Sequence, residues 1–150
     1  MNSNLEKLLI IDFGSQFTQL IGRKLRELNV FSEIIPYQNV SNKTLENYNP
    51  KAVILSGGPS SVVGKKFPLP PSNLFDLDIP VLGICYGLQV MMKLLGGTVY
   101  SGTGTSEFGK AILKKTVSNS KIINDLFIKG QEQVWMSHGD HVSGLSEGFE

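Results

Sequence analysis

Short apolar runs alternate with amphipathic segments along the first two-thirds of the chain. Residues 8–11 and 52–55 are wholly apolar, which is typical of strands buried on both faces of a parallel sheet. Residues 17–28 carry apolar side chains at helical spacing and charged side chains on the opposite face. The predicted strands are residues 8–11, 30–36, 52–55 and 79–84, and the predicted helices are residues 17–28, 41–48 and 86–95. This alternation predicts an α/β fold with an open, mostly parallel twisted sheet and helices on both faces.

Polar residues and glycines mark the ends of these predicted helices. Ser15 and Ser41 are candidate N-caps, because a serine hydroxyl can accept a hydrogen bond from a free N–H of the first turn. Asn29 should end the first helix, and Gly96 with Gly97 should stop the third. Residues 64–72, dense in Lys and Pro, predict a loop and the most mobile segment of the chain.

The pattern changes after residue 97. Residues 98–100, 111–117 and 133–136 look like short strands separated by turns, which predicts a smaller β region added to the α/β unit. The length of 150 residues suits one domain with a real core. Residues 148–150 close the chain without a predicted helix or strand, so we expect residues 1–150 to form a domain that is incomplete at its C-terminal end.

Three predicted strands end in conspicuous loops. These are residues 12–15, residues 56–59 and the turn at residues 83–87. The carboxyl ends of parallel strands meet at one edge of a sheet, and ligands of open α/β sheets bind beyond that edge. The three loops therefore predict a single candidate site.

The turn at residues 83–87 holds the only cysteine of the chain, Cys85, between two glycines. This pattern of strand, tight turn, reactive side chain and helix is typical of a nucleophile elbow. The N-terminus of the following helix favours a thiolate. The alternative is a buried structural cysteine, and the elbow pattern alone does not separate the two. For a nucleophile, the N–H of Tyr86 and the N–H of Gly58 are the candidate oxyanion donors.

Composition removes several classes of function. The formal net charge of +1 offers no electrostatic basis for binding nucleic acid or an anionic membrane surface. One cysteine excludes an internal disulfide framework and fits the reducing cytoplasm. Residues 138–141 hold three potential metal ligands, but Met136 stands where a further histidine is needed, so no metal site is expected. His138 and His141 are predicted to lie in a polar surface turn or to serve on the substrate side.

Taken together, these motifs resemble the class I (triad-type) glutamine amidotransferases, whose fold is flavodoxin-like. Residues 55–59 (Leu-Ser-Gly-Gly-Pro) and 80–89 (Pro-Val-Leu-Gly-Ile-Cys-Tyr-Gly-Leu-Gln) are similar to the signatures of the whole class. Residues 11–21, 107–109 and 134–140 resemble the amidotransferase domain of the GMP synthase branch. The resemblance covers essentially the whole chain, with the motifs in the same order.

The resemblance implies roles for seven residues. Cys85 would be the nucleophile, and Gly58 and Tyr86 would supply the oxyanion hole. Gln89 would orient the bound glutamine, and Ser137, Gly139 and Asp140 would meet its amino-acid end. The family takes its base and its orienting carboxylate from a later His-Pro-Glu segment, which this chain does not contain, and His138 is not the position of that base. We therefore expect the isolated chain to turn over little or no glutamine.

The resemblance also implies partners. L-glutamine would be the substrate, and its ammonia would aminate xanthosine monophosphate to GMP in purine biosynthesis. ATP and Mg²⁺ would act in an ATP pyrophosphatase domain that these 150 residues lack, as they lack a dimerisation domain, and no cofactor is expected here. The whole enzyme would be a homodimer. The alternatives are an amidotransferase component of another pathway, such as anthranilate or carbamoyl phosphate synthesis, and a non-catalytic α/β binding or regulatory module.

Overall fold

A four-stranded parallel sheet forms the centre of the protein. The computed structural model describes residues 6–102, 107–116, 127 and 130–149. The strand order is β2-β1-β3-β4, and all three strand pairs are parallel. The strands are β1 (Lys7–Asp12), β2 (Phe31–Pro36), β3 (Ala52–Leu55) and β4 (Val81–Gly83). All four predicted strands are confirmed, although β4 is shorter than residues 79–84.

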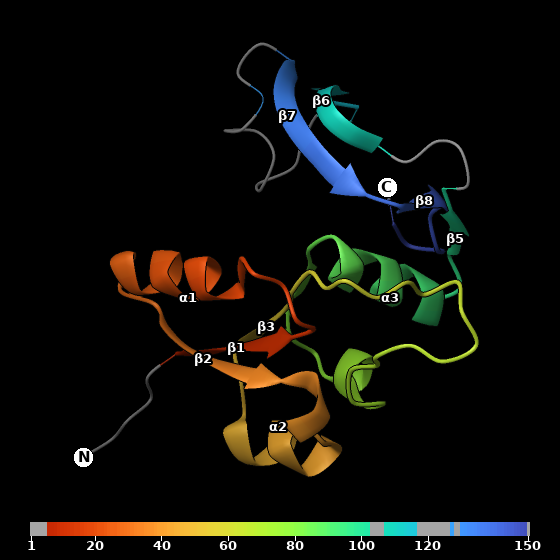
Figure 1. Cartoon of the computed structure of the whole chain (residues 1–150). Coiled ribbons are helices and arrows are strands. Elements are labelled where there is room, and N and C mark those ends of the chain that lie inside the picture. Colours follow the sequence, from red (N-terminus) through yellow and green to blue (C-terminus); the bar gives the residue numbers. More distant parts are fainter. Residues whose placement is uncertain (1–5, 103–106, 117–126, 128–129, 150) are drawn as a thin grey trace.

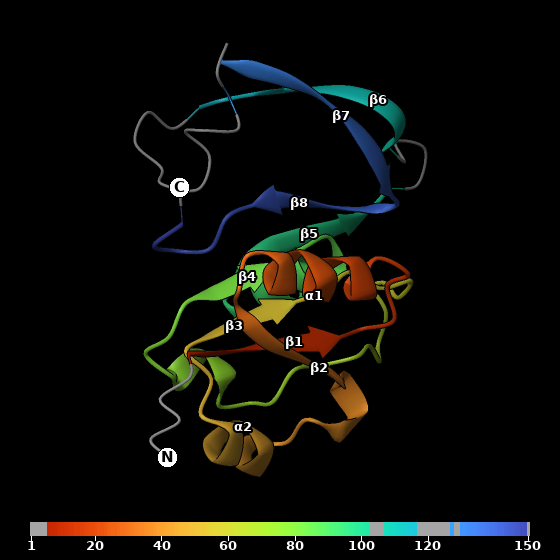
Figure 2. The ribbon, with the colours of Figure 1, turned by 90° about the vertical axis from the view of Figure 1, so that its left-hand side faces the viewer.

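Helices cover both faces of this sheet. α1 (Thr18–Glu27) packs on the face that carries Ile10, and α2 (Asn42–Tyr48) and α3 (Tyr86–Leu94) pack on the face that carries Leu9 and Ile11. Figures 1 and 2 show α1 and α2 on opposite sides of the sheet. Two 3₁₀ turns, η1 (Tyr37–Asn39) and η2 (Leu74–Asp76), complete the connections between strands. The predicted α/β class is thereby confirmed, with helices on both faces.

The alternation of side chains along β1 explains why its sequence is a continuous apolar run. Leu9 and Ile11 belong to the hydrophobic core that also holds Leu45 of α2 and Val90 of α3. Ile10 points to the opposite face, toward α1. A Cβ added to Gly22 of α1 would lie 3.7 Å from the Cδ1 atom of Ile10. All three β1 residues are fully buried. A strand enclosed on both sides has no solvent face and therefore needs no polar positions.

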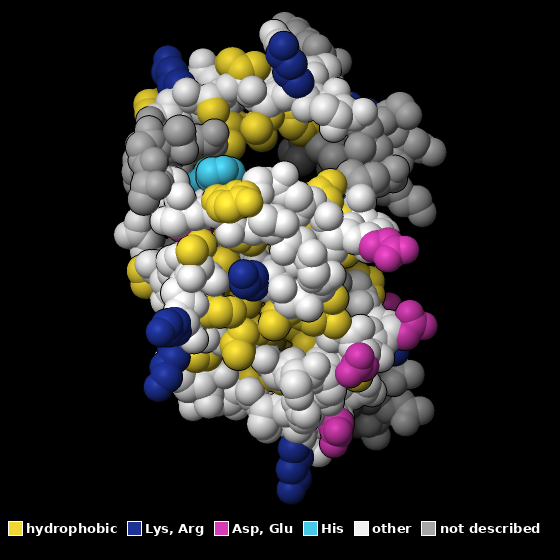
Figure 3. Space-filling model, turned by 90° about the vertical axis from the view of Figure 1, so that its right-hand side faces the viewer, with side chains coloured by type: hydrophobic (Ala, Val, Ile, Leu, Met, Phe, Trp, Pro, Cys, Tyr) yellow, Lys and Arg dark blue, Asp and Glu magenta, His cyan; other side chains and the backbone are white. Residues whose placement is uncertain are grey.

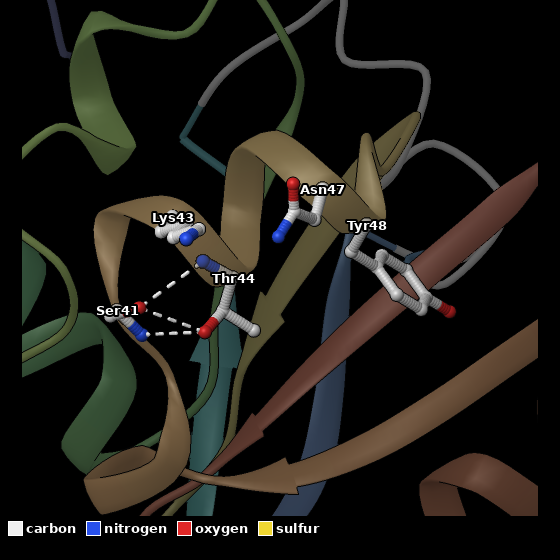
Figure 4. A pocket seen from close by; sticks show the side chains of 5 residues that line it. All are labelled: Ser41, Lys43, Thr44, Asn47 and Tyr48. Atoms are coloured by element: carbon white, nitrogen blue, oxygen red, sulfur yellow. Dashed lines mark hydrogen bonds between the residues drawn. The ribbon is translucent and has the colours of Figure 1, made fainter.

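The structure confirms one of the two predicted serine N-caps and contradicts the other. Ser41 caps α2 as predicted: its hydroxyl accepts from the N–H of Thr44, and the Thr44 hydroxyl accepts from the N–H of Ser41 (Figure 4). The prediction for Ser15 is wrong, because α1 begins at Thr18 with Phe17 as an N-cap that makes no side-chain bond. The Ser15 hydroxyl instead accepts from the N–H of Phe17 and closes a local turn before the helix. Asn29, at φ 60°, follows the end of α1 in the left-handed conformation.

The predicted β region after residue 97 consists of two antiparallel strand pairs (Figures 1 and 2). β5 (Thr98–Ser101) pairs with β8 (Asp140–Gly144), and β6 (Glu107–Lys114) pairs with β7 (Gln131–His138). β7 extends beyond residues 133–136 at both ends. β6 starts before the predicted range of residues 111–117 and ends at Lys114, so residues 115–116 are not strand, and residue 117 lies outside the described residues. β8 was not predicted. The expected polar turn over residues 137–141 is wrong, because β7 runs to His138, β8 starts at Asp140, and Gly139 alone joins them.

The surface combines apolar and charged areas. On the face shown in Figure 3, hydrophobic side chains gather near the centre and acidic side chains lie along one edge, while basic side chains are scattered over the rest of the face. Large apolar side chains are also exposed on α1 and β7, including Phe17, Leu20 and Trp135. Within the described residues, no helix is both long and apolar enough to cross a membrane.

Candidate active site

Cys85 lies in the turn between β4 and α3 and adopts a strained backbone conformation. Its φ is 52° and its ψ is −112°, a backbone region that residues other than glycine rarely occupy. Such a conformation costs roughly 1–3 kcal/mol and persists only where the surroundings impose it. The thiol is exposed to solvent. The alternative of a buried structural cysteine is therefore wrong.

Two glycines permit this turn, because a side chain at either position would collide with neighbouring backbone atoms. A Cβ on Gly83 would lie 2.7 Å from the Cα atom of Leu88. A Cβ on Gly87 would overlap the carbonyl oxygen of Leu55 at the end of β3. The N–H of Gly87 also donates to the Ser56 carbonyl at 3.0 Å. The absence of both side chains lets α3 start directly against β3, which places Cys85 at the edge of the sheet.

Cys85 opens into a cavity of about 790 Å³ at the carboxyl edge of the sheet. The turn after β1, the loop after β3 and the Cys85 turn all line this cavity, which confirms that the three predicted loops form one site. Strand β7 forms a further wall. The residues that line it are Gly14, Ser15, Gln16, Phe17, Ile21, Gly57, Gly58, Pro59, Ile84, Cys85, Leu88, Trp135, Met136, Ser137 and His138. A smaller hollow of about 420 Å³ lies on α2, away from this edge (Figure 4).

The two candidate oxyanion donors lie beside Cys85. The N–H groups of Gly58 and Tyr86 make no hydrogen bond to any described residue. Gly58 lines the cavity, whereas Tyr86 is fully buried and is not among its lining residues. Gly57 borders the nucleophile, since a Cβ built on it would lie 3.6 Å from the Cβ of Cys85. The sequence suggested that Gly58 leaves room for substrate. The structure shows a different requirement, because a Cβ there would lie 2.5 Å from the carbonyl oxygen of Phe13.

The side chain of Tyr86 anchors the start of α3 in the core. It is fully buried, its hydroxyl donates to the Pro68 carbonyl, and its ring packs on Phe13 with 5.1 Å between ring centroids. Burial, with a smaller contribution from Tyr37, raises the pKa of Tyr86 to about 12. The side chain of Tyr86 therefore belongs to the core, and its role as an oxyanion donor stays a prediction for its backbone N–H.

The four residues predicted to bind the substrate do not all reach the cavity. Ser137 lines it, whereas Gln89, Gly139 and Asp140 do not. The Gln89 amide instead donates to the backbone carbonyl of Asp140 at 2.9 Å, and both residues are buried. The Asp140 Oδ2 atom is buried and has no hydrogen-bond partner among the described residues. The structure thus brings Cys85, Gly58 and Ser137 to one cavity, and joins Gln89 to Asp140 behind it.

His138 stands in the wall formed by β7, while His141 lies on β8 with its ring 6.5 Å from that of Tyr100. In the described part of the chain, no hydrogen bond joins either histidine to the Cys85 thiol. Nor do three His, Cys, Asp or Glu side chains gather there as a metal ion would require. The residues that line the cavity therefore include a thiol at Cys85, a backbone N–H at Gly58 that is unpaired among the described residues and a hydroxyl at Ser137, groups that suit attack on a carbonyl carbon.

A family model described as glutamine amidotransferase class-I matches residues 9–150. The chain belongs to this family. Among sequence relatives of this amidotransferase, a protein of Cereibacter sphaeroides named GMP synthase (glutamine-hydrolyzing) is 59% identical over 145 residues, covering 97% of the chain and 28% of the relative. A protein of the same name from Brachyspira hyodysenteriae is 49% identical over 150 residues, covering 100% of the chain and 28% of the relative. The chain thus spans 28% of the length of these curated relatives.

Solved structures agree with the flavodoxin-like amidotransferase fold. A protein from Thermoplasma acidophilum, described as a putative GMP synthase subunit, is similar with a TM-score of 0.78 and 27% identity, over 99% of this chain and 72% of that one. A glutamine amidotransferase from Thermotoga maritima shares the fold with a TM-score of 0.68 and 23% identity, over 98% of this chain and 70% of that one.

Part of the amidotransferase cavity wall was not predicted as a site. Gln16, Phe17 and Ile21 line the cavity from the start of α1, and Trp135 and Met136 line it from β7. The first three lie within residues 11–21 and the other two within residues 134–140, both of which were noted as motifs of one branch of the family. These branch-specific motifs were the signal in the sequence from which the missed cavity residues could have been predicted.

Proposed function

We propose that this chain is the glutamine-binding and nucleophile-bearing part of a GMP synthase, which releases ammonia from glutamine for the amination of xanthosine monophosphate. The observation that carries the proposal is the strained, exposed Cys85, which shares a cavity with Gly58. The sequence identity of 59% to a relative named GMP synthase favours this pathway over anthranilate or carbamoyl phosphate synthesis.

The reaction follows from the chemistry of these groups. The Cys85 thiolate attacks the side-chain amide carbon of glutamine, and the N–H groups of Tyr86 and Gly58 stabilise the oxyanion that forms. Collapse of this tetrahedral intermediate expels ammonia and leaves a glutamyl thioester. Water then attacks the thioester, which releases glutamate and restores the thiol. A general acid must protonate the leaving amine, and a base must activate the water.

The acid and base are proposed to come from a His-Pro-Glu segment that the 150 residues do not include. The isolated chain should therefore acylate slowly and release ammonia at or near the background rate. His138 lies in the cavity wall, but it is not the position from which the resemblance takes the base.

The amino-acid end of glutamine is proposed to lie against β7, where Ser137 offers a hydroxyl to the cavity. Gln89 and Asp140 would act from behind this wall, because their hydrogen bond fixes α3 to the first residue of β8. Gly139 would act as the joint between β7 and β8. ATP and Mg²⁺ would serve an ATP pyrophosphatase domain outside this chain, the domain described here would need no cofactor, and the whole enzyme would be a cytoplasmic homodimer.

A chloroketone analogue of L-glutamine tests the proposal, because it places an electrophilic carbonyl where the amide would lie. We expect the analogue to add once to Cys85, with a rate that saturates with its concentration and falls when L-glutamine competes. Intact-mass measurement and peptide mapping would follow the reaction, with Cys85→Ser as the unreactive control. D-glutamine should not protect. Labelling that neither saturates nor responds to L-glutamine would refute the proposal.

The expected lack of turnover has its own test. Ammonia released from L-glutamine by the isolated chain would be measured against the Cys85→Ala variant. We expect the two rates to be indistinguishable. A substantial rate that disappears in Cys85→Ala would show that the chain carries its own base.

A further inference from the structure

The carboxylate of Asp12 holds the turn after β1 together without lining the cavity. Asp12 is the last residue of β1, and its Oδ1 atom accepts from the Gly14 N–H at 2.9 Å and from the Thr18 hydroxyl at 2.8 Å. The Ser56 hydroxyl lies 3.3 Å from the same oxygen. Thr18 and Ser56 are almost completely buried. One carboxylate oxygen thus joins β1, the start of α1 and the loop after β3.

Ser56 continues this connection to the site. Its hydroxyl oxygen accepts from the Phe13 N–H at 3.0 Å and lies 2.8 Å from the Gly57 carbonyl oxygen. Its own carbonyl oxygen accepts from the N–H of Gly87 at the start of α3. Ser56 therefore contacts the turn after β1, the Gly57–Gly58 loop and the helix that follows Cys85.

The position of the turn after β1 decides where Gly58 lies. Gly58 packs on the backbone of Phe13 so closely that a Cβ would lie 2.5 Å from the Phe13 carbonyl oxygen. The backbone N–H groups of Phe13 and Gly14 are the ones held by Ser56 and Asp12. We therefore expect a movement of this turn to displace Gly58, which lines the cavity and whose N–H has no hydrogen-bond partner among the described residues.

From these contacts we propose that Asp12 is a positioning residue for glutamine hydrolysis: through the turn after β1 and through Ser56, it fixes the Gly58 N–H at the distance from Cys85 that an oxyanion needs. This inference rests on the proposed function. Asp12 does not touch the substrate. Loss of an entire oxyanion donor lowers a rate by about 100- to 1,000-fold. Displacement of the donor without its loss should cost less, about tenfold.

Two reagents separate this role from a general effect on the fold. The thiolate attacks the ketone carbon of the glutamine chloroketone, which forms an oxyanion before chloride leaves and the sulfur stays alkylated. With iodoacetamide the thiolate displaces iodide directly from carbon, so no oxyanion forms and the rate reports only access to the thiolate. For Asp12→Ala we expect the maximal rate of chloroketone labelling at Cys85 to fall about tenfold. The concentration for half-maximal rate should change less than twofold, and so should the iodoacetamide rate.

Variants of graded strength and a matched control complete the test. An Asn at position 12 keeps an acceptor oxygen but loses the charge, and hydrogen bonds to a charged acceptor are about twice as strong. Asp12→Asn should therefore label at an intermediate rate, about threefold below the unmodified chain. Asp78→Ala removes an exposed aspartate before β4 and should match the unmodified chain with both reagents. Thermal unfolding by circular dichroism would confirm that each variant is folded.

The outcomes are distinct. Chloroketone rates of Asp12→Ala and Asp12→Asn equal to that of the unmodified chain would overturn the positioning role while leaving the proposed function intact. An equal fall with both reagents would also overturn it, since it would show a general effect on Cys85. If Asp12→Ala does not fold, the isosteric Asp12→Asn decides by the same criteria. An unmodified chain that the analogue does not label saturably would overturn the proposed function and this role with it.

Discussion

The side-chain amide of Gln89 donates a hydrogen bond of 2.9 Å to the backbone carbonyl of Asp140. This bond joins the first turns of α3, which follow Cys85, to the first residue of β8. Both residues are buried, so water cannot replace the bond if it is lost. It connects the half of the site that carries the nucleophile to the half that carries β7 and β8.

Replacing Gln89 by methionine should destabilise the protein. Methionine keeps most of the side-chain volume but cannot donate to the Asp140 carbonyl, and a buried acceptor without a partner costs about 1–3 kcal/mol. Urea denaturation followed by circular dichroism would measure the loss. Gln38→Met, at an exposed position in η1, is the matched control and should change the free energy of unfolding by less than about 0.5 kcal/mol. Equal stability of the two variants would contradict the assigned role of this bond.

Gly87→Ala should be strongly destabilising although Gly87 lies within a helix. Alanine is favoured over glycine in helices by about 1 kcal/mol. The added Cβ would, however, overlap the Leu55 carbonyl, and overpacking of this kind costs about 1–3 kcal/mol or more. We expect a net loss of about 2 kcal/mol in the free energy of unfolding. For Gly64→Ala the nearest atom would lie 3.9 Å away, so its stability should be nearly unchanged. A stabilised Gly87→Ala would show that α3 can shift away from β3.

The protein should lose folding stability at alkaline pH because Tyr86 ionises there. Its folded-state pKa of about 12 lies above the ordinary tyrosine value of 10.0, so the fold favours the neutral phenol. The resulting stabilisation is complete below pH 10 and is lost as the pH rises toward 12. Tyr86→Phe lacks this titration and also lacks the bond to Pro68. The stability difference between the parent chain and Tyr86→Phe should be constant up to pH 10 and then shrink by up to about 1.4 kcal/mol per pH unit. Urea denaturation across this pH range checks it, and a constant difference throughout would contradict it.

The capping box of α2 predicts a local loss of stability. Ser41→Ala removes the hydroxyl that accepts from the Thr44 N–H and should cost about 1 kcal/mol. Lys43→Ala, two residues further on in the same exposed turn, keeps the cap and should change stability by less than about 0.5 kcal/mol. Thermal unfolding measures both. If Lys43→Ala proved the more damaging of the two, the cap would not be what holds this helix.

The sheet was predictable because its strands are enclosed on both faces. Leu9, Ile10 and Ile11 leave no position where a polar side chain would be tolerated, so the run is visible in sequence alone. The start of α1 was not predictable in the same way. Ser15 has the side chain of an N-cap, but Asp12 holds both Gly14 and Thr18, and this tertiary arrangement delays the helix to Thr18.

The site was predictable where it depends on backbone conformation and less so where it depends on distant strands. Cys85 and Gly58 lie in turns that the neighbouring glycines indicate in the sequence. β8 is short, and its pairing with β5 joins residues some forty positions apart. The resemblance assigned Gln89 to the substrate, and that role stays a prediction. Its amide donates to the carbonyl of Asp140, 51 positions further along the chain, and the sequence alone does not indicate this contact.

The cavity wall formed by β7 also has a consequence for how the protein is made. The loops around Cys85 belong to residues 14–88, whereas the opposite wall belongs to residues 135–138. A chain that grows from its N-terminus therefore completes the elbow and its sheet before the facing strand exists. Each nascent molecule therefore passes through a stage in which the residues around Cys85 have been made while the cavity still lacks one wall. β7 later encloses the cavity from that side, although Cys85 itself stays exposed in the complete structure.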